Sequence, residues 1–146
     1  MRVVIQRVKE ASVKVDGKIV GQIAQGMLIF LGVAREDSVT SADYLLKKVT
    51  ELRIFEDAQG KMNVSAEEAG AQFLVVSQFT LYGNCDKGRR PSFDEAADPV
   101  KGEELYNYFV TQLKYIKAGV ETGQFRAMMD VSLINDGPVT FIIDSK

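Results

Sequence analysis

The fold class of this chain is decided by the stretch Ser12-Val13-Lys14-Val15-Asp16-Gly17-Lys18-Ile19-Val20-Gly21-Gln22-Ile23. Residues that favour strands lie on both sides of the central Asp16-Gly17 pair. An Asp-Gly pair suits a type I′ turn, because both central residues of that turn need positive φ. The stretch therefore predicts a β-hairpin, and the preceding residues 3–8 are β-rich as well.

Further strand and helix patterns follow along the chain. Residues 27–33 form a continuous apolar run, which is typical of a strand buried on both faces. Residues 42–52 carry apolar side chains at helical spacing, after candidate caps at Ser38, Thr40 and Ser41. Asp98-Pro99 begins a second helical pattern that ends before Gly119. The other expected strands lie at residues 54–55, at 61–64 after a turn at Gln59-Gly60, at 71–79 and, as a pair, within 120–143.

The expected architecture follows from two helices among seven or eight strands, most of them linked by hairpins. It is an α+β fold of mostly antiparallel sheets curled like a barrel, with the two main helices packed outside. A chain of 146 residues with 46% hydrophobic residues fits one domain, which we expect to span residues 1–146.

The absence of histidine restricts the chemistry of any active site in this chain. The sequence has no His and one Cys, so Ser-His-Asp and Cys-His machinery and familiar zinc sites are excluded. We expect no metal and no cofactor, with an all-oxygen Mg²⁺ or Ca²⁺ site as the formal alternative. The net charge of −2 argues against wrapping along nucleic acid, but a local basic patch can still grip one end of it.

The sequence is typical of a cytoplasmic protein without a membrane segment. Its first residues lack a long apolar run, and the run at residues 27–34 is far shorter than the roughly 20 residues that span a bilayer. The single cysteine, Cys85, cannot form an internal disulfide, which agrees with a reducing compartment.

Two hydroxyls and an amide gather where Ser77-Gln78-Phe79-Thr80 ends an apolar strand and enters a long polar loop. Residues at such a position are often aimed at a ligand. One interpretation is that Ser77 and Thr80 only satisfy backbone groups at the strand end. The other is a nucleophile or a turn of backbone N–H groups that binds an anion, although no base for a nucleophile is close in sequence.

A basic cluster follows in the same loop. Lys87, Arg89 and Arg90 precede Phe93, a combination that suits phosphate contacts beside a stacking surface. A solvated run of charge is the alternative. Without further information, Phe79 and Phe125 are expected in the core, and Met128 and Met129 are expected in a strand with packing roles.

A third motif, Asn135-Asp136-Gly137-Pro138-Val139-Thr140, lies between two apolar runs near the C-terminus. Its residue types favour a turn between two strands. Pro138 has no N–H to donate to a hairpin ladder, so a functional loop is the competing interpretation.

These motifs together resemble the D-aminoacyl-tRNA deacylase (D-tyrosyl-tRNA deacylase) family. The resemblance rests on Ser77-Gln78-Phe79-Thr80-Leu81-Tyr82-Gly83, residues 87–93, Thr122-Gly123-x-Phe125, the motif at residues 135–140 and the opening Met1-Arg2-x-Val4-x-Gln6-Arg7-Val8. It covers essentially the whole chain. One departure is Arg126, which stands where the family usually has Gly.

The resemblance implies a cytoplasmic homodimeric hydrolase with its active site at the subunit interface. Its substrate would be the 3′ end of a tRNA that carries a D-amino acid, or glycine mischarged on tRNA-Ala. By resemblance, the catalytic site comprises Ser77, Gln78, Phe79 and Thr80, with Thr80 as a nucleophile considered in the family. A cis Gly137-Pro138 bond would enter the partner's site and exclude L-amino acids. Pocket and loop support would come from Arg7, Phe125, Met129 and Asn135, and tRNA contacts from Lys87, Arg89 and Arg90.

The residues themselves favour a catalytic route assisted by RNA. A chain without histidine is poorly equipped to activate a hydroxyl, whereas the ribose 2′-OH beside an aminoacyl ester can orient or activate water. Backbone N–H groups around residues 78–80 would stabilise the oxyanion. The alternatives are an esterase with Ser77 or Thr80 as nucleophile, and a non-catalytic module that binds RNA ends.

Overall fold

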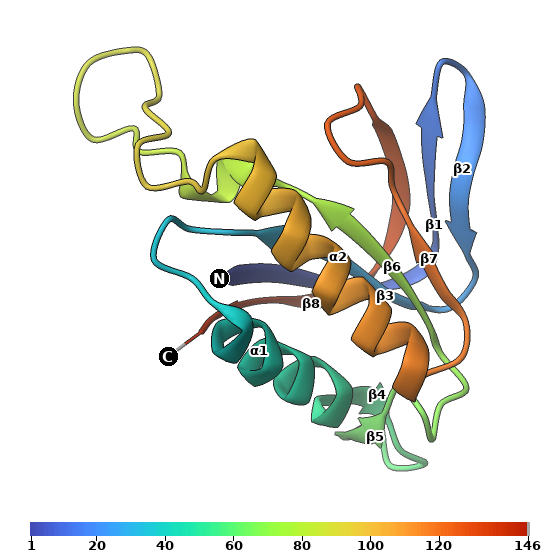
Figure 1. Ribbon diagram of the computed structural model, residues 1–146. Coiled ribbons are helices and arrows are strands. Elements are labelled where there is room, and N and C mark those ends of the chain that lie inside the picture. Colours follow the sequence, from blue (N-terminus) through green and yellow to red (C-terminus); the bar gives the residue numbers. More distant parts are fainter. Residues whose placement is uncertain (146) are drawn as a thin grey trace.

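The computed structural model describes residues 1–145 and shows a strongly curved sheet with two helices against its outer surface (Figure 1). The expected α+β architecture, with mostly antiparallel strands curled like a barrel, is confirmed. The elements are β1 (Arg2–Val15), β2 (Lys18–Ile23), β3 (Gly26–Gly32), α1 (Val39–Glu51), β4 (Arg53–Glu56), β5 (Met62–Ser65), β6 (Gln72–Ser77), the 3₁₀ helix η1 (Phe79–Tyr82), α2 (Pro99–Ile116), β7 (Val120–Thr122) and β8 (Asp130–Asp144).

The predicted hairpin joins β1 to β2. Asp16 and Gly17 have φ values of 49° and 74°, as a type I′ turn requires. β1 is one strand of 14 residues, longer than the two β-rich segments predicted. It pairs with β3 through residues 2–8 and with β2 through residues 11–15, and the polar Lys9 and Glu10 are exposed between these two segments.

The large sheet has the order β2-β1-β3-β6-β7, with β8 paired to β1. The β3–β6 and β6–β7 pairs are parallel, so the sheet is mixed at this end. β2 curls round so close to β7 that a Cβ on Gly21 would lie only 2.3 Å from the Thr122 carbonyl oxygen. A glycine at this position allows the two strands to approach and nearly close the barrel.

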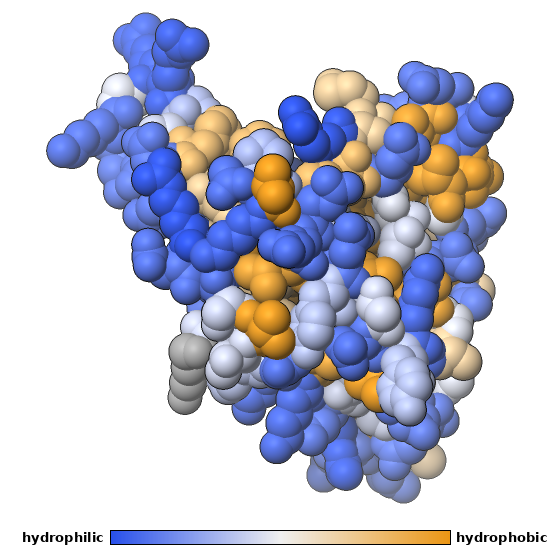
Figure 2. Space-filling view, viewed as in Figure 1, coloured by the Kyte–Doolittle hydropathy of each residue, from blue (hydrophilic) through white to orange (hydrophobic). Residues whose placement is uncertain are grey.

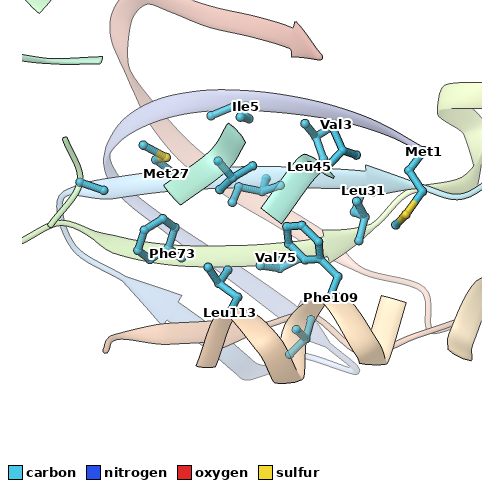
Figure 3. Packing of buried hydrophobic residues seen from close by; sticks show 14 of the residues in the cluster. Met1, Val3, Ile5, Met27, Leu31, Leu45, Phe73, Val75, Phe109 and Leu113 are labelled. Carbon is cyan, nitrogen blue, oxygen red and sulfur yellow. The ribbon is translucent and has the colours of Figure 1, made fainter. Parts of the chain in front are cut away.

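Both helices begin at the caps that the sequence predicts. Ser38 and Ser41 form a capping box at the start of α1, and the Asp98 carboxylate accepts hydrogen bonds from the first N–H groups of α2. Figure 3 shows Leu45 of α1 together with Phe109 and Leu113 of α2 in the hydrophobic core formed with the sheet. No helix within residues 1–145 is long and apolar enough to cross a membrane.

The motif at residues 135–140 does not reverse the chain, so the prediction of a turn between two strands is wrong. Thr140 pairs with Gln6 and Asn135 pairs with Val8, on the same strand β1 and in the same antiparallel direction. The residues between them form a bulge within β8, because more residues of β8 than of β1 span this part of the ladder. The Gly137-Pro138 peptide bond in this bulge is cis.

The outer edge of β8 is free of other strands within the part of the chain that the structure describes. The strand is 15 residues long, and its Ile134 and Ile142 side chains are exposed. A long edge strand with exposed apolar residues is a template for pairing with another chain. This edge carries the Gly137-Pro138 bulge.

Candidate functional site

A cavity of about 630 Å³ lies where β6, η1, the start of α2 and the segment after β7 meet. Such a volume is within the range of small-molecule sites. Its lining is mainly apolar with a few polar groups, and it includes Val33, Val76, Ser77, Gln78, Phe79, Phe93, Ala96, Ala97, Asp98, Pro99, Gly102, Phe125, Arg126, Ala127, Met128, Met129 and Val131. Ser77, Gln78 and Phe79 are thus brought together with Phe125 and Met129, as a common site requires.

The end of β6 positions the polar residues of the cavity. Ser77 is the last residue of β6, and the Gln78 N–H donates to the Leu31 carbonyl of β3 at 2.8 Å. The Gln78 N–H is therefore not available to a ligand. The first two N–H groups of η1, those of Phe79 and Thr80, have no backbone acceptor among the described residues and remain potential donors, whereas the Leu81 N–H donates to the Gln78 carbonyl at 3.3 Å.

Thr80 stands apart from the other three residues of the motif. It is exposed and does not line the cavity. Its hydroxyl oxygen accepts a hydrogen bond from the Gln78 side-chain amide. No histidine exists in the chain, and no carboxylate or lysine is hydrogen-bonded to this hydroxyl within residues 1–145. The contact gives Thr80 a partner that cannot accept its proton.

The prediction that Phe79 lies in the core is wrong. Its side chain is 56% exposed and meets Phe93 edge-on, with ring centroids 5.0 Å apart. Phe125 is half-buried and packs against the core, with its ring centroid 5.8 Å from that of Tyr106. Tyr106 is itself fixed by donating from its hydroxyl to the Val75 carbonyl at 2.9 Å, and burial raises its pKa to about 12.

Met129 does not lie in a strand as predicted, because β7 ends at Thr122 and β8 begins only at Asp130. It is half-buried and lines the cavity, next to Gly123. A Cβ on Gly123 would lie 2.7 Å from the Met129 sulfur atom, so the absence of a side chain at Gly123 leaves room for the Met129 side chain. The strand prediction failed because the two methionines belong to an irregular segment set by contacts with distant residues.

The buried Arg7 side chain holds the bulge of β8 in place. Only 4% of this residue is exposed, and its Nε donates to the Asp136 carbonyl at 3.2 Å and lies 3.0 Å from the Asp136 carboxylate. Its other nitrogens donate to the Ile54 carbonyl at 2.6 Å and to Glu56 at 3.3 Å. One guanidinium thus connects β1, β4 and the bulge.

The Asn135 side chain also holds this bulge in place. Its amide Nδ2 donates to the carbonyls of Arg7 at 3.0 Å and Val139 at 3.2 Å. The exposed Gly137 and Pro138 are therefore held on a supported backbone. Neither residue lines the cavity of its own chain. The structure does not bring the two motifs together within one chain.

Lys87, Arg89 and Arg90 lie in a loop that projects from the body of the protein (Figure 1). The loop is closed at its base by two backbone hydrogen bonds between Asn84 and Ser92, of 2.8 and 2.9 Å. The three basic side chains are exposed, and Figure 2 shows the projecting tip as hydrophilic. None of the three lines the cavity.

Arg2 does not line the cavity but holds η1 in place, a role that the sequence did not indicate. Its guanidinium donates to Asp144 at 2.7 Å and to the Leu81 carbonyl at 3.1 Å, and lies over the Tyr82 ring at 5.4 Å. These contacts tie η1 to the ends of β1 and β8. The partners are far apart in sequence, so no local pattern could have indicated them.

No group of three or more His, Cys, Asp or Glu residues in the described 1–145 range is arranged to hold a metal ion. The cavity offers apolar walls, a few neutral polar groups and two charged residues, Asp98 and Arg126. Such a lining suits a ligand that is largely apolar and is oriented by a few polar contacts.

Comparison with known proteins gives one consistent result. The family model described as D-Tyr-tRNA(Tyr) deacylase matches residues 4–144. A D-aminoacyl-tRNA deacylase of Desulfatibacillum aliphaticivorans is 59% identical over 146 residues, with 100% of both chains covered. One of Bacillus mycoides (strain KBAB4) is 57% identical over 100% of both chains. A third, of Symbiobacterium thermophilum, is 55% identical and covers 100% of this chain and 97% of its own.

Solved structures agree on the fold. A structure titled c-Myc DNA Unwinding Element Binding Protein superposes with a TM-score of 0.94 and 37% identity, covering 100% of this chain and 99% of its own. A probable eukaryotic D-amino acid tRNA deacylase has the same fold, with a TM-score of 0.86, 19% identity and 98% of both chains covered.

The fold and the relatives define the class of the protein, which is an α+β enzyme of the hydrolase type. The resemblance seen in the sequence motifs is confirmed. The chain belongs to the D-Tyr-tRNA(Tyr) deacylase family.

Replacing Arg7 with methionine should lower the free energy of unfolding by about 2–4 kcal/mol, because the Ile54 carbonyl and the Asp136 carboxylate lose their buried donor. Urea denaturation measures this loss. Arg53→Met is the matched control, because Arg53 is exposed on β4 and forms no ion pair within residues 1–145, so its charge should contribute only about 0–1 kcal/mol. Equal losses in the two variants would contradict a special role of Arg7.

Proposed function

We propose that the protein hydrolyses the ester between a D-amino acid and the terminal adenosine of tRNA, in the cytoplasm. The observation that carries this proposal is full-length similarity to D-aminoacyl-tRNA deacylases at 55–59% identity. The cavity supports it, because apolar walls from Phe79 and Phe125 suit an aminoacyl group and an adenine ring. Ser77, Gln78, Phe79 and Thr80 would form the catalytic site.

The catalytic step in this proposal uses the RNA more than the protein. The Thr80 hydroxyl has the Gln78 amide as its partner and no base, which disfavours it as a nucleophile. The 2′-OH of the terminal ribose would orient water towards the ester carbonyl. The free N–H groups of Phe79 and Thr80 at the start of η1 would donate to the tetrahedral oxyanion, and each such donor is worth roughly 3–4 kcal/mol.

Selectivity in the proposal comes from a second copy of the chain. The Gly137-Pro138 bulge is exposed on a free β8 edge, away from the cavity of its own chain, which supports its use by another subunit. A homodimer paired through this region would place the bulge at its partner's cavity. Backbone close to the substrate Cα would collide with an L side chain and leave room for a D side chain.

Glycine would pass the same filter, because it has no side chain to exclude. Glycine mischarged on tRNA-Ala is therefore a further proposed substrate. The body of the tRNA would be met by the projecting loop, where Lys87, Arg89 and Arg90 are exposed and able to bind phosphates. With few phosphates contacted, the salt dependence of binding should be shallow.

The test is to incubate the purified protein with D-tyrosyl-tRNA and L-tyrosyl-tRNA and to follow ester loss. We expect hydrolysis of the D form, with the L form decaying at its uncatalysed rate. Loss of both forms would replace the proposal with a general esterase. Binding of both without ester loss would replace it with a non-catalytic module for RNA ends.

A further inference from the structure

Arg126 has a backbone conformation that its residue type does not favour. Its φ is 60°, and it is the third residue of a turn closed by the Ala127 N–H donating to the Gln124 carbonyl at 3.2 Å. A positive φ at this position of a turn is normally supplied by Gly or Asn. An arginine here is unfavourable for the stability of the turn, which raises the question of what its side chain does.

Only one other non-glycine residue in the range 1–145 has a positive φ. It is Asp16, at 49°, in the β1–β2 hairpin. A short polar side chain such as Asp is well suited to that conformation, because it can hydrogen-bond to nearby backbone. Arg126 has no such local explanation, so the conformation favours a role for its guanidinium.

The surroundings of Arg126 indicate where that guanidinium acts. The residue is exposed and lines the cavity. It forms no hydrogen bond or ion pair with any residue among those described. Asp98 is the acidic residue in the lining, and its carboxylate accepts from the Val100 and Lys101 N–H groups at the start of α2. Arg126 is therefore a cation at the cavity without a protein partner among residues 1–145.

The chemistry of a guanidinium selects an anionic ligand. Its planar donors match the oxygens of a phosphate in a bidentate geometry. In the substrate proposed above, the aminoacyl group carries a positive amine, and the nearest negative charge is the phosphodiester 5′ to the terminal adenosine. We infer that Arg126 binds this phosphodiester and so holds the tRNA 3′ end at the cavity. This inference rests on the proposed function.

A phosphate contact of this kind is made alike in the ground state and the transition state. Its loss should therefore raise KM and leave kcat nearly unchanged. One fewer phosphate contact on a single strand should also reduce the slope of log(kcat/KM) against log[salt] by about 0.7. A merely structural role of Arg126 would not change that slope.

The experiment compares Arg126→Gly, Arg126→Gln and Arg126→Lys on D-tyrosyl-tRNA over a series of salt concentrations. For Arg126→Gly and Arg126→Gln we expect KM to rise about tenfold and the salt slope to fall. Arg126→Lys should keep the slope with a smaller rise in KM. Arg126→Gly should also shift the denaturation midpoint upward, because glycine tolerates the positive φ, whereas Arg126→Gln should not.

Three results separate the possible failures. An unchanged salt slope in Arg126→Gln would overturn the phosphate contact while the proposed function stands. A loss confined to D-aspartyl-tRNA would overturn it too, by assigning Arg126 to the amino-acid side chain. Failure of the unaltered protein to hydrolyse D-tyrosyl-tRNA would instead remove the proposed function.

Discussion

Replacing Gly137 with valine is expected to lower kcat/KM on D-tyrosyl-tRNA by about 100-fold or more. The proposed filter works because backbone without a side chain approaches the substrate Cα, and misplacement there by about 1 Å can cost a factor of this size. A Cβ at Gly137 would also lie 2.6 Å from the Asn135 Oδ1, so the added side chain would disturb the bulge. Single-turnover hydrolysis measures the loss.

Asn135→Ala is the control for this experiment. It removes the amide that supports the Arg7 and Val139 carbonyls but adds no bulk to the bulge. We expect it to loosen selectivity, with more hydrolysis of L-tyrosyl-tRNA, and to retain turnover of the D form. Thermal unfolding of both variants shows whether they remain folded. Normal deacylation by a folded Gly137→Val variant would refute the assignment of the filter.

The second large effect concerns the RNA. A tRNA that ends in 2′-deoxyadenosine should be hydrolysed about 100- to 1,000-fold more slowly, as expected when a group that stabilises the transition state is removed. Thr80→Ala should retain most activity on the normal substrate, because Thr80 is outside the cavity and has no base. Rates under single-turnover conditions compare the two changes directly.

Thr80→Ser is the matched control, because it keeps the hydroxyl that accepts from Gln78. A large loss of turnover in Thr80→Ala together with normal turnover in Thr80→Ser would make the hydroxyl catalytic. Unimpaired hydrolysis of the deoxy substrate would remove the 2′-OH from the mechanism. Each of these outcomes replaces RNA assistance with catalysis by the protein.

Much of the fold was predictable because its signals are local. The Asp16-Gly17 turn, the buried run that became β3 and the caps at Ser38 and Asp98 each depend on residues a few positions apart. The bulge in β8 was mistaken for a turn, because its residue types are those of a turn. Only the pairing of both flanks with β1 distinguishes the two, and that pairing joins residues far apart in sequence.

The candidate site was likewise predictable only where its signals are local in the sequence. The strand end at Ser77 and Gln78 was predicted from one short motif, and it does line the cavity. The exposure of Phe79 and the irregular segment around Met129 depend on how η1 and the end of β7 meet α2. The local pattern of apolar residues therefore could not predict them. The left-handed conformation of Arg126 was likewise visible only in the folded backbone.

The placement of Gly137-Pro138 on the free edge of β8 has a consequence for how two mutations combine in one cell. In the proposed dimer each active site is assembled from the cavity of one chain and the bulge of the other. A chain with a damaged bulge would leave its own cavity intact and spoil that of its partner. A variant with a damaged cavity and a variant with a damaged bulge should therefore complement each other when both are expressed in one cell, because their mixed dimer contains one site built from an intact cavity and an intact bulge.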